Sequence, residues 1–185
     1  MYYYAIWHND RKFMQVKGGY PMRDNPVLKR HHDPKSASRR QAIGIAGPSR
    51  NHYVWLLGLD VAETPELLKR IKEGLGYSSW ESFIRNTDFR KDDAVSLVQI
   101  SSRTLSRRKE EGRLHPDESD RLIRAARIFA FTLELFDGDA VSARRWLTTA
   151  QPALGGSTPI VYASTEVGAR EVEALIGRIE HGIPS

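Results

Sequence analysis

The residues best suited to chemistry lie between Ala94 and Arg113, where a short apolar segment leads into hydroxyl and basic side chains. A small residue in one helix, a tight turn and a serine-led basic helix are typical of a helix-turn-helix, which places its second helix in the major groove of DNA. Hydroxyl groups and helix N-termini bind phosphate, and arginine donates paired hydrogen bonds to guanine. We therefore expect DNA contacts from Ser101, Ser102, Arg103, Thr104, Ser106, Arg107, Arg108, Lys109 and Arg113.

These residues have two expected roles. Helical spacing places Arg103 and Arg107 on the outer face of the second helix, where they can reach base edges, and Ile100 and Leu105 fit the buried side of the motif. Phosphate contacts are expected from three further cations, Arg108, Lys109 and Arg113. Spacing alone equally allows a solvated basic helix in an ordinary helical bundle.

The turn of this motif contains an unusual residue. Gln99 stands where such turns often carry glycine, at a backbone position that can require a positive φ. A residue with a side chain costs about 1 kcal/mol in that conformation or imposes a different turn.

Catalytic patterns are weaker. The chain contains no nucleophile elbow, no Walker phosphate loop, no His-Glu-x-x-His and no cysteine. Asp117, Glu118 and Asp120 resemble an acid–base cluster, but acids in a first helical turn usually complement the helix dipole. Gly155 and Gly156 precede a helix and suit a turn better than an anion site. We expect no enzyme activity, no cofactor and no metal.

Composition and charge narrow the function class. The 185 residues are 40% hydrophobic and 28% charged, which is globular composition. No apolar run reaches the roughly 18–20 residues of a membrane span, and no signal-peptide pattern begins the chain. Residues 1–60 carry 10 Lys and Arg against 4 Asp and Glu, so most of the net charge of +5 arises there. These features predict a cytoplasmic protein that tolerates a polyanionic partner.

The elements that must position these residues are expected to be helices. Proline, serine, threonine and glycine signals predict an all-α body with helices over 65–72, from 78, over 90–98, over 102–111, from 115 to 138, over 140–148, from 158 and from 165. In the last helix, we expect Val172, Leu175, Ile176 and Ile179 to be buried. Residues 1–60 are expected to form a flexible basic extension, because turn signals interrupt any helical period before about residue 55.

Two segments resemble a known family. Thr104-Leu105-Ser106-Arg107-Arg108-Lys109, Gly112-Arg113-Leu114 and Glu118–Arg124 resemble the helix-turn-helix region of Xre/ParS/MbcA-like antitoxins. Downstream, Ala143–Leu147, Ala153–Pro159 and Arg178–Gly182 are similar to the C-terminal toxin-binding domain of that family. The likeness covers roughly residues 66–183.

The resemblance implies an antitoxin of a RES-Xre toxin–antitoxin module. Its partner would be a RES-domain toxin that depletes cellular NAD, and the C-terminal domain would dock over the toxin's active site. The helix-turn-helix would bind operator DNA to regulate the operon, and the antitoxin would act as a homodimer within a larger complex. Carried onto this chain, the toxin-binding residues would be Trp146, Leu147, Leu154, Gly155, Gly156, Arg178, Glu180 and Gly182.

The expected organisation is therefore a basic extension over 1–60, a helix-turn-helix domain over 61–125 and a small helical toxin-binding domain over 126–185. The alternative is a stand-alone helix-turn-helix repressor whose C-terminal domain oligomerises or binds a small ligand. The two differ in whether a toxin partner exists.

Overall fold

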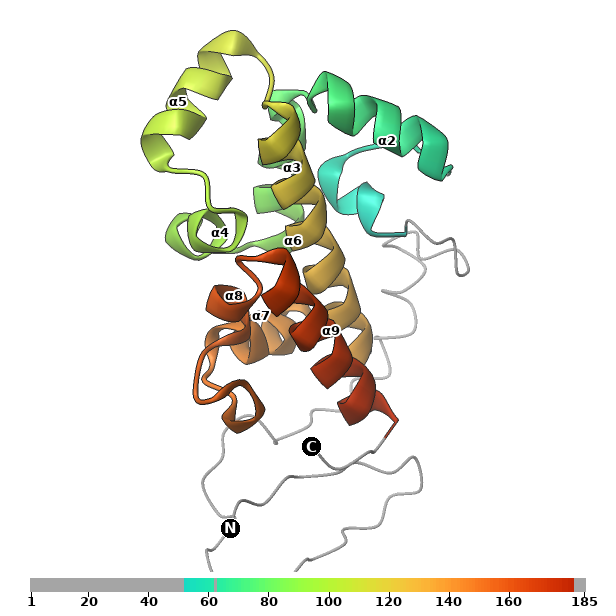
Figure 1. The fold of residues 1–185 in the computed structure, drawn as a ribbon, viewed down its shortest axis with the longest axis vertical. Helices are drawn as coiled ribbons and strands as arrows, with labels where there is room; N and C mark the ends of the chain where they lie inside the picture. The colour runs from blue at the N-terminus through green and yellow to red at the C-terminus, as the bar shows by residue number, and fades with distance from the viewer. Residues whose placement is uncertain (1–51, 62, 182–185) are drawn as a thin grey trace, which may run out of the picture.

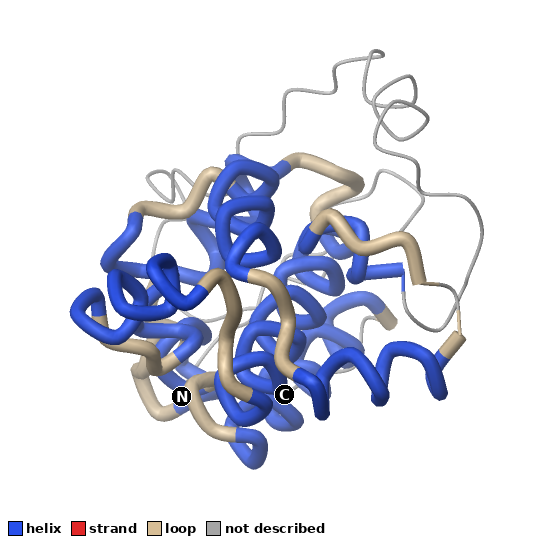
Figure 2. The backbone as a smooth tube through the Cα atoms, turned by 90° about the horizontal axis from the view of Figure 1, so that it is seen from above, coloured by secondary structure: helices blue, strands red, loops and turns tan. Residues whose placement is uncertain are grey.

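The computed structural model describes residues 52–61 and 63–181, and within those ranges every regular element is a helix. Short helix η2 (His52–Leu57) precedes α2 (Thr64–Glu73), α3 (Tyr77–Thr87), α4 (Lys91–Val98), α5 (Ser102–Glu111) and the long α6 (Pro116–Leu135). Helices α7 (Ala140–Thr148), η3 (Pro152–Leu154), α8 (Pro159–Tyr162) and α9 (Glu166–Glu180) complete the chain. The expected all-α class is confirmed (Figure 2).

Helix α6 is the axis of the molecule (Figure 1). It packs against η2, α2, α3 and α4 along one part of its length and against α7 and α9 along the rest. Its buried side chains include Leu122, Ile128 and Phe129, all fully enclosed. Because α6 is one continuous helix, no linker separates the N-terminal and C-terminal groups of helices.

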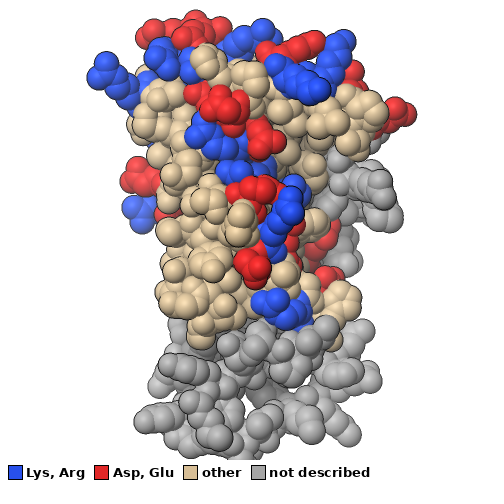
Figure 3. All heavy atoms as spheres, viewed as in Figure 1, with Lys and Arg blue, Asp and Glu red and all other residues tan. Residues whose placement is uncertain are grey.

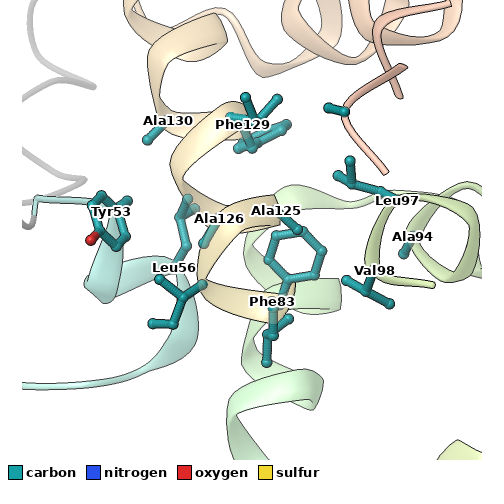
Figure 4. Packing of buried hydrophobic residues seen from close by; sticks show 14 of the residues in the cluster. Tyr53, Leu56, Phe83, Ala94, Leu97, Val98, Ala125, Ala126, Phe129 and Ala130 are labelled. Carbon is teal, nitrogen blue, oxygen red and sulfur yellow. The ribbon is translucent and has the colours of Figure 1, made fainter. Parts of the chain in front are cut away.

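Aromatic and aliphatic side chains from several helices meet on α6 (Figure 4). The Phe89 and Phe129 rings pack edge to face with centroids 5.3 Å apart, and Phe83 stands 6.1 Å from Phe89. Ala94 of α4 is fully buried, as expected for a helix that its successor must approach closely. Ile100 and Leu105 are also buried, which confirms the expected inner side of the motif.

Local signals fix most helix ends. Thr165 caps α9 by accepting the Gly168 N–H, and Gly112 ends α5 in the left-handed conformation with φ 74°. Val172, Leu175 and Ile176 are buried as expected, whereas Ile179, in the last turn of α9, is 36% exposed. The predicted glycine stop at Gly182 lies outside the described residues.

The expected basic extension needs a correction at its end. Tyr53, Val54, Leu56 and Leu57 are buried, and η2 packs against α3 and α6. The side-chain amide of Asn86 on α3 also donates to the Leu56 carbonyl at 3.1 Å. Residues 53–57 therefore belong to the core, because their apolar side chains cover one side of α6. Residues 1–51 lie outside the described part of the chain.

Candidate nucleic-acid interface and protein-docking site

The α4–turn–α5 segment has the geometry of a helix-turn-helix. Gln99 ends α4 in the left-handed conformation with φ 53°, so the turn keeps the backbone that glycine usually supplies. The Gln99 side-chain amide donates to the Ser96 carbonyl, and the Gln99 carbonyl accepts a hydrogen bond from Arg121 of α6 at 3.0 Å. These contacts offset the cost of a side chain at positive φ.

Ser101 begins the recognition helix α5. Its side chain accepts the Thr104 N–H at 3.1 Å, which confirms the expected serine cap. Among the residues expected to contact DNA, those that face solvent are Ser101, Ser102, Arg103, Ser106, Arg107, Lys109 and Arg113, while Thr104 is half-buried. Arg103 and Arg107 are thus exposed as the expected outer face requires, and Lys and Arg side chains lie at the top of the molecule around α5, with Asp and Glu among them (Figure 3).

Arg108 is an exception and corrects the expected phosphate contact. Its side chain is only 4% exposed, and its Nε donates to Glu118 of α6 at 2.6 Å. Its guanidinium also pairs with Glu111 on the same helix. A buried, doubly paired guanidinium is directed away from any DNA groove, so Arg108 joins α5 to α6 and does not contact phosphate.

Glu118 completes this link from the other side. Its carboxylate also accepts the His115 N–H at 2.8 Å, which caps the start of α6. Burial raises the pKa of Glu118, but the hydrogen bonds from Arg108 and His115 outweigh it and hold that pKa below its ordinary value. Two features of the sequence could have identified this pair. Arg108 follows Leu105 by three residues, which places it on the same, buried face of α5, and Glu118 stands three residues after the cap residue of α6.

The neighbouring acids also have structural contacts. Asp117 pairs with Arg121 at 2.7 Å, and Arg121 is the residue that holds the Gln99 carbonyl. Glu118 is committed to Arg108. Two of the three carboxylates in the acid cluster of the sequence thus position helices.

The end of α5 is held by the loop between α2 and α3. The Leu114 N–H donates to the Leu75 carbonyl at 2.8 Å, and the Tyr77 N–H donates to the Gly112 carbonyl at 2.9 Å. This short ladder fixes the backbone around Arg113 while its side chain remains exposed. Both ends of the recognition helix are therefore anchored.

The residues expected to bind a toxin divide into two groups. Trp146, Leu147 and Leu154 are 6%, 0% and 5% exposed, so they belong to the core and do not present side chains to a partner. Helix α7 packs against α6 and α8, and burial of such large apolar side chains is favoured over their exposure to water, which is the physical reason for this correction. Gly155, Gly156 and Glu180 are exposed, Arg178 is half-buried, and Gly182 lies outside the described residues.

Polar side chains tie the C-terminal helices to the helix-turn-helix. Arg144 of α7 donates to the Thr87 carbonyl at the end of α3 at 2.9 Å and pairs with Asp88 at 3.2 Å. Arg127 of α6 pairs with Glu173 of α9 at 2.6 Å. Helix α8 also packs against α4, the first helix of the motif. The two candidate surfaces are therefore carried by one continuous scaffold.

No helix within residues 52–61 and 63–181 combines the length and the apolar character needed to cross a bilayer. The same residues contain no group of three or more His, Asp or Glu side chains arranged to hold a metal ion.

Comparison with known proteins matches two parts of the chain that meet within α6. Residues 66–127 match the antitoxin Xre-like helix-turn-helix domain, and residues 132–182 match the antitoxin Xre/MbcA/ParS C-terminal toxin-binding domain. Helix α6 bridges the two matches. The regions of both resemblances found in the sequence are thus confirmed.

Three curated proteins are similar to this chain. It is 35% identical to antitoxin Xre of Yersinia enterocolitica over 128 residues, which are 69% of this chain and 86% of that protein. It is also 35% identical to antitoxin Xre of Photorhabdus laumondii over 130 residues, covering 70% and 88% of the two chains. Antitoxin Xre of Pseudomonas putida is 39% identical over 84 residues, covering 45% and 52%.

Proposed function

This chain belongs to the Xre family of antitoxins, and we propose that it neutralises a RES-domain toxin with its C-terminal domain and represses its own operon with its helix-turn-helix. It acts in the cytoplasm by binding and not by catalysis. The C-terminal domain covers the active site of the toxin and so prevents NAD depletion. The observation that carries the proposal is the pairing of an anchored recognition helix with a toxin-binding domain on one α6 scaffold.

The RES partner is supported by the resemblance of residues 143–182 to antitoxins of that module. The test is co-expression of the full-length chain with the product of the adjacent gene, followed by affinity co-purification and measurement of cellular NAD. We expect a stable complex and restored NAD. Growth rescue with NAD still depleted would contradict a RES-type partner.

The absence of any complex, with operator binding intact, would favour the alternative of a stand-alone repressor. A C-terminal truncation is a poor control in this experiment. Removing α8 and α9 would delete the buried side chains of Val172 and Leu175 and uncover the parts of α6 and α7 that these helices pack against, so loss of binding would report unfolding. Point variants on the surface are the better tools.

If α5 reads the operator, its exposed arginines and its lysine should contribute to DNA binding in different ways. Arg103 is exposed, and the Arg107 side chain is 61% exposed with only a long 3.7 Å contact to Glu111, so both can reach base edges. We expect Arg103→Ala or Arg107→Ala to cost roughly 1–3 kcal/mol of operator binding and to relax sequence preference at one position. Fluorescence anisotropy on operator and random duplexes measures both effects.

Lys109→Ala is the matched control for these arginines, because it lies on the same helix and is expected to contact phosphate. It should weaken operator and random DNA alike and lower the salt dependence by about one counterion. Equal losses on both duplexes for all three variants would contradict base reading. If two copies bind together, footprints should show half-sites about 34 Å apart, or a multiple of that distance.

A further inference from the structure

The segment from Trp146 to Thr165 has an unusual composition. It contains no Asp, Glu, Lys, Arg or His, whereas 28% of the whole chain is charged. It covers the end of α7, η3, the Gly155–Gly156 turn and α8. Although Trp146, Leu147 and Leu154 are buried, much of the rest of the segment lies at the surface. Depletion of charge is the compositional signature of the core of a protein interface.

The structure gathers these residues on one face. In Figure 3 the visible surface at the lower left, where Figure 1 places η3 and α8, shows no Lys, Arg, Asp or Glu, while charged side chains crowd the surface around α5 and α2 above it. We name the exposed part of residues 148–165, together with Val167, the uncharged face.

Four polar side chains on the uncharged face already have hydrogen-bond partners within the chain. The Thr148 hydroxyl donates to the Arg144 carbonyl at 2.9 Å, and the Thr149 hydroxyl donates to the Arg145 carbonyl at 2.7 Å. The Gln151 amide donates to the Thr149 carbonyl, and the Thr165 hydroxyl accepts the Gly168 N–H. Covering this face with another protein therefore costs little in lost hydrogen bonds to water.

Large apolar side chains are exposed on α8 and in the first turn of α9. Val161 is 55% exposed, Tyr162 38% and Val167 77%. Among the described residues, five of the six exposed large hydrophobic side chains lie within the toxin-binding match at 132–182, and Leu68 of α2 is the other. Exposed apolar residues concentrated in one domain indicate an interaction surface there.

The backbone holds these three side chains in place. An added Cβ at Gly168 would stand 1.8 Å from the Tyr162 carbonyl oxygen, so the end of α8 lies directly on the first turn of α9. The other side of α8 packs against α4 and α7. A fixed arrangement reduces the entropy that a partner must overcome on binding.

We propose that Val161, Tyr162 and Val167 are the anchors of the toxin-docking surface, and that the toxin offers them a complementary apolar patch without charge. This inference rests on the toxin neutralisation proposed above and names the residues that perform it. The occupant is a toxin because the uncharged face lies within the toxin-binding match. Three side chains are too few for a stable interface of about 800 Å² per partner, so Thr148, Thr149 and the Gly155–Gly156 turn form its rim.

The test introduces charge at the anchors. Val161→Glu, Val167→Glu and the double variant are made in the full-length chain, with Leu68→Glu as the matched control because Leu68 is 50% exposed on α2. Affinity for an inactive form of the adjacent gene's product, the proposed toxin, is measured by calorimetry. Thermal unfolding, operator affinity and molar mass of each variant are recorded.

We expect each anchor variant to weaken toxin binding by roughly 100-fold or more, because an unpaired carboxylate would be buried in the complex. Leu68→Glu should bind the toxin as the unaltered chain does, and all variants should unfold at similar temperatures and bind operator equally. NAD protection in cells should be lost only with the anchor variants.

Other outcomes overturn the inference in distinguishable ways. If the unaltered chain binds the toxin and both anchor variants bind it equally well, the assignment of the docking surface is wrong. The proposed function would not be contradicted by that result. The same result with a lowered molar mass would make the uncharged face an interface between copies of this chain. If the unaltered chain does not bind the toxin, both the docking surface and the proposed toxin neutralisation are contradicted.

Discussion

Replacing Glu118 by alanine is expected to lower the free energy of unfolding by about 3–5 kcal/mol, the range for breaking a buried ion pair. The substitution leaves the Arg108 guanidinium in a nearly closed environment with only Glu111 as a partner. It also removes the acceptor of the His115 N–H at the start of α6. Chemical unfolding followed by circular dichroism measures the loss.

Glu66→Ala is the control for that variant. Glu66 also pairs with an arginine, Arg70, at 3.0 Å, but both side chains are more than 40% exposed. Water screens such a pair, so its loss should cost less than about 1 kcal/mol. If Glu118→Ala were no more destabilising than Glu66→Ala, the buried pair would not hold α5 against α6.

The double variant Arg108→Met with Glu118→Leu separates two explanations of the loss. If the cost of Glu118→Ala is that of an uncompensated charge, apolar side chains of similar size should recover most of the stability. Operator affinity should recover with it only if packing alone orients α5. A stable double variant that binds the operator poorly would assign the orientation of the recognition helix to the ion pair itself.

The same pair predicts a pH dependence. The pKa of Glu118 is lower in the folded chain than in the unfolded one, so its contribution to stability is fully present above the unfolded pKa. That contribution is lost as the pH falls through the lower, folded pKa. Unfolding free energies measured from pH 7 to pH 3 should therefore fall less steeply in Glu118→Gln than in the unaltered chain. Equal slopes would contradict this account.

Gly168→Ala is expected to destabilise the toxin-binding half of the molecule by about 3 kcal/mol. Alanine normally stabilises a helix relative to glycine. Here the added methyl group would stand 1.8 Å from the Tyr162 carbonyl oxygen and 3.2 Å from the Thr165 hydroxyl. Because the nearer atom belongs to the backbone, α8 must move away from α9, and Val161 and Tyr162 must move with it.

Gly177→Ala, in the same helix, is the matched control. An added Cβ at Gly177 meets nothing within 4 Å, so the substitution should raise stability by up to about 1 kcal/mol. Thermal unfolding and toxin affinity are measured for both variants. Similar stability of the two variants would show that α8 does not lie as close to α9 as the structure places it.

The toxin affinity of Gly168→Ala also tests whether the uncharged face is the docking surface. We expect the loss to exceed the loss of operator affinity, because α8 carries two of the three anchors while the recognition helix α5 is held by α6 and by the α2–α3 loop. Equal losses of both activities would indicate that α8 transmits its displacement to the helix-turn-helix through α4, against which it packs.

The sequence by itself determined the helices and the order of the two domains. Proline, glycine and hydroxyl residues act on the backbone within one turn, so Ser101, Gly112 and Thr165 mark helix ends without knowledge of the rest of the fold. Helical periodicity similarly identified Ala94, Ile100 and Leu105 as buried. The exposed cations of α5, Arg107 among them, could be named for the same reason.

Only the tertiary structure decided the exceptions to this pattern of buried and exposed side chains. Arg108 looks like its neighbours in the sequence and is buried because Glu118, ten residues away on another helix, meets it. Trp146 and Leu147 carry the family resemblance, yet α7 turns them inward and leaves Val161, Tyr162 and Val167 outside. Burial and pairing depend on contacts between residues distant in the chain, and those contacts are set by how the helices pack on α6.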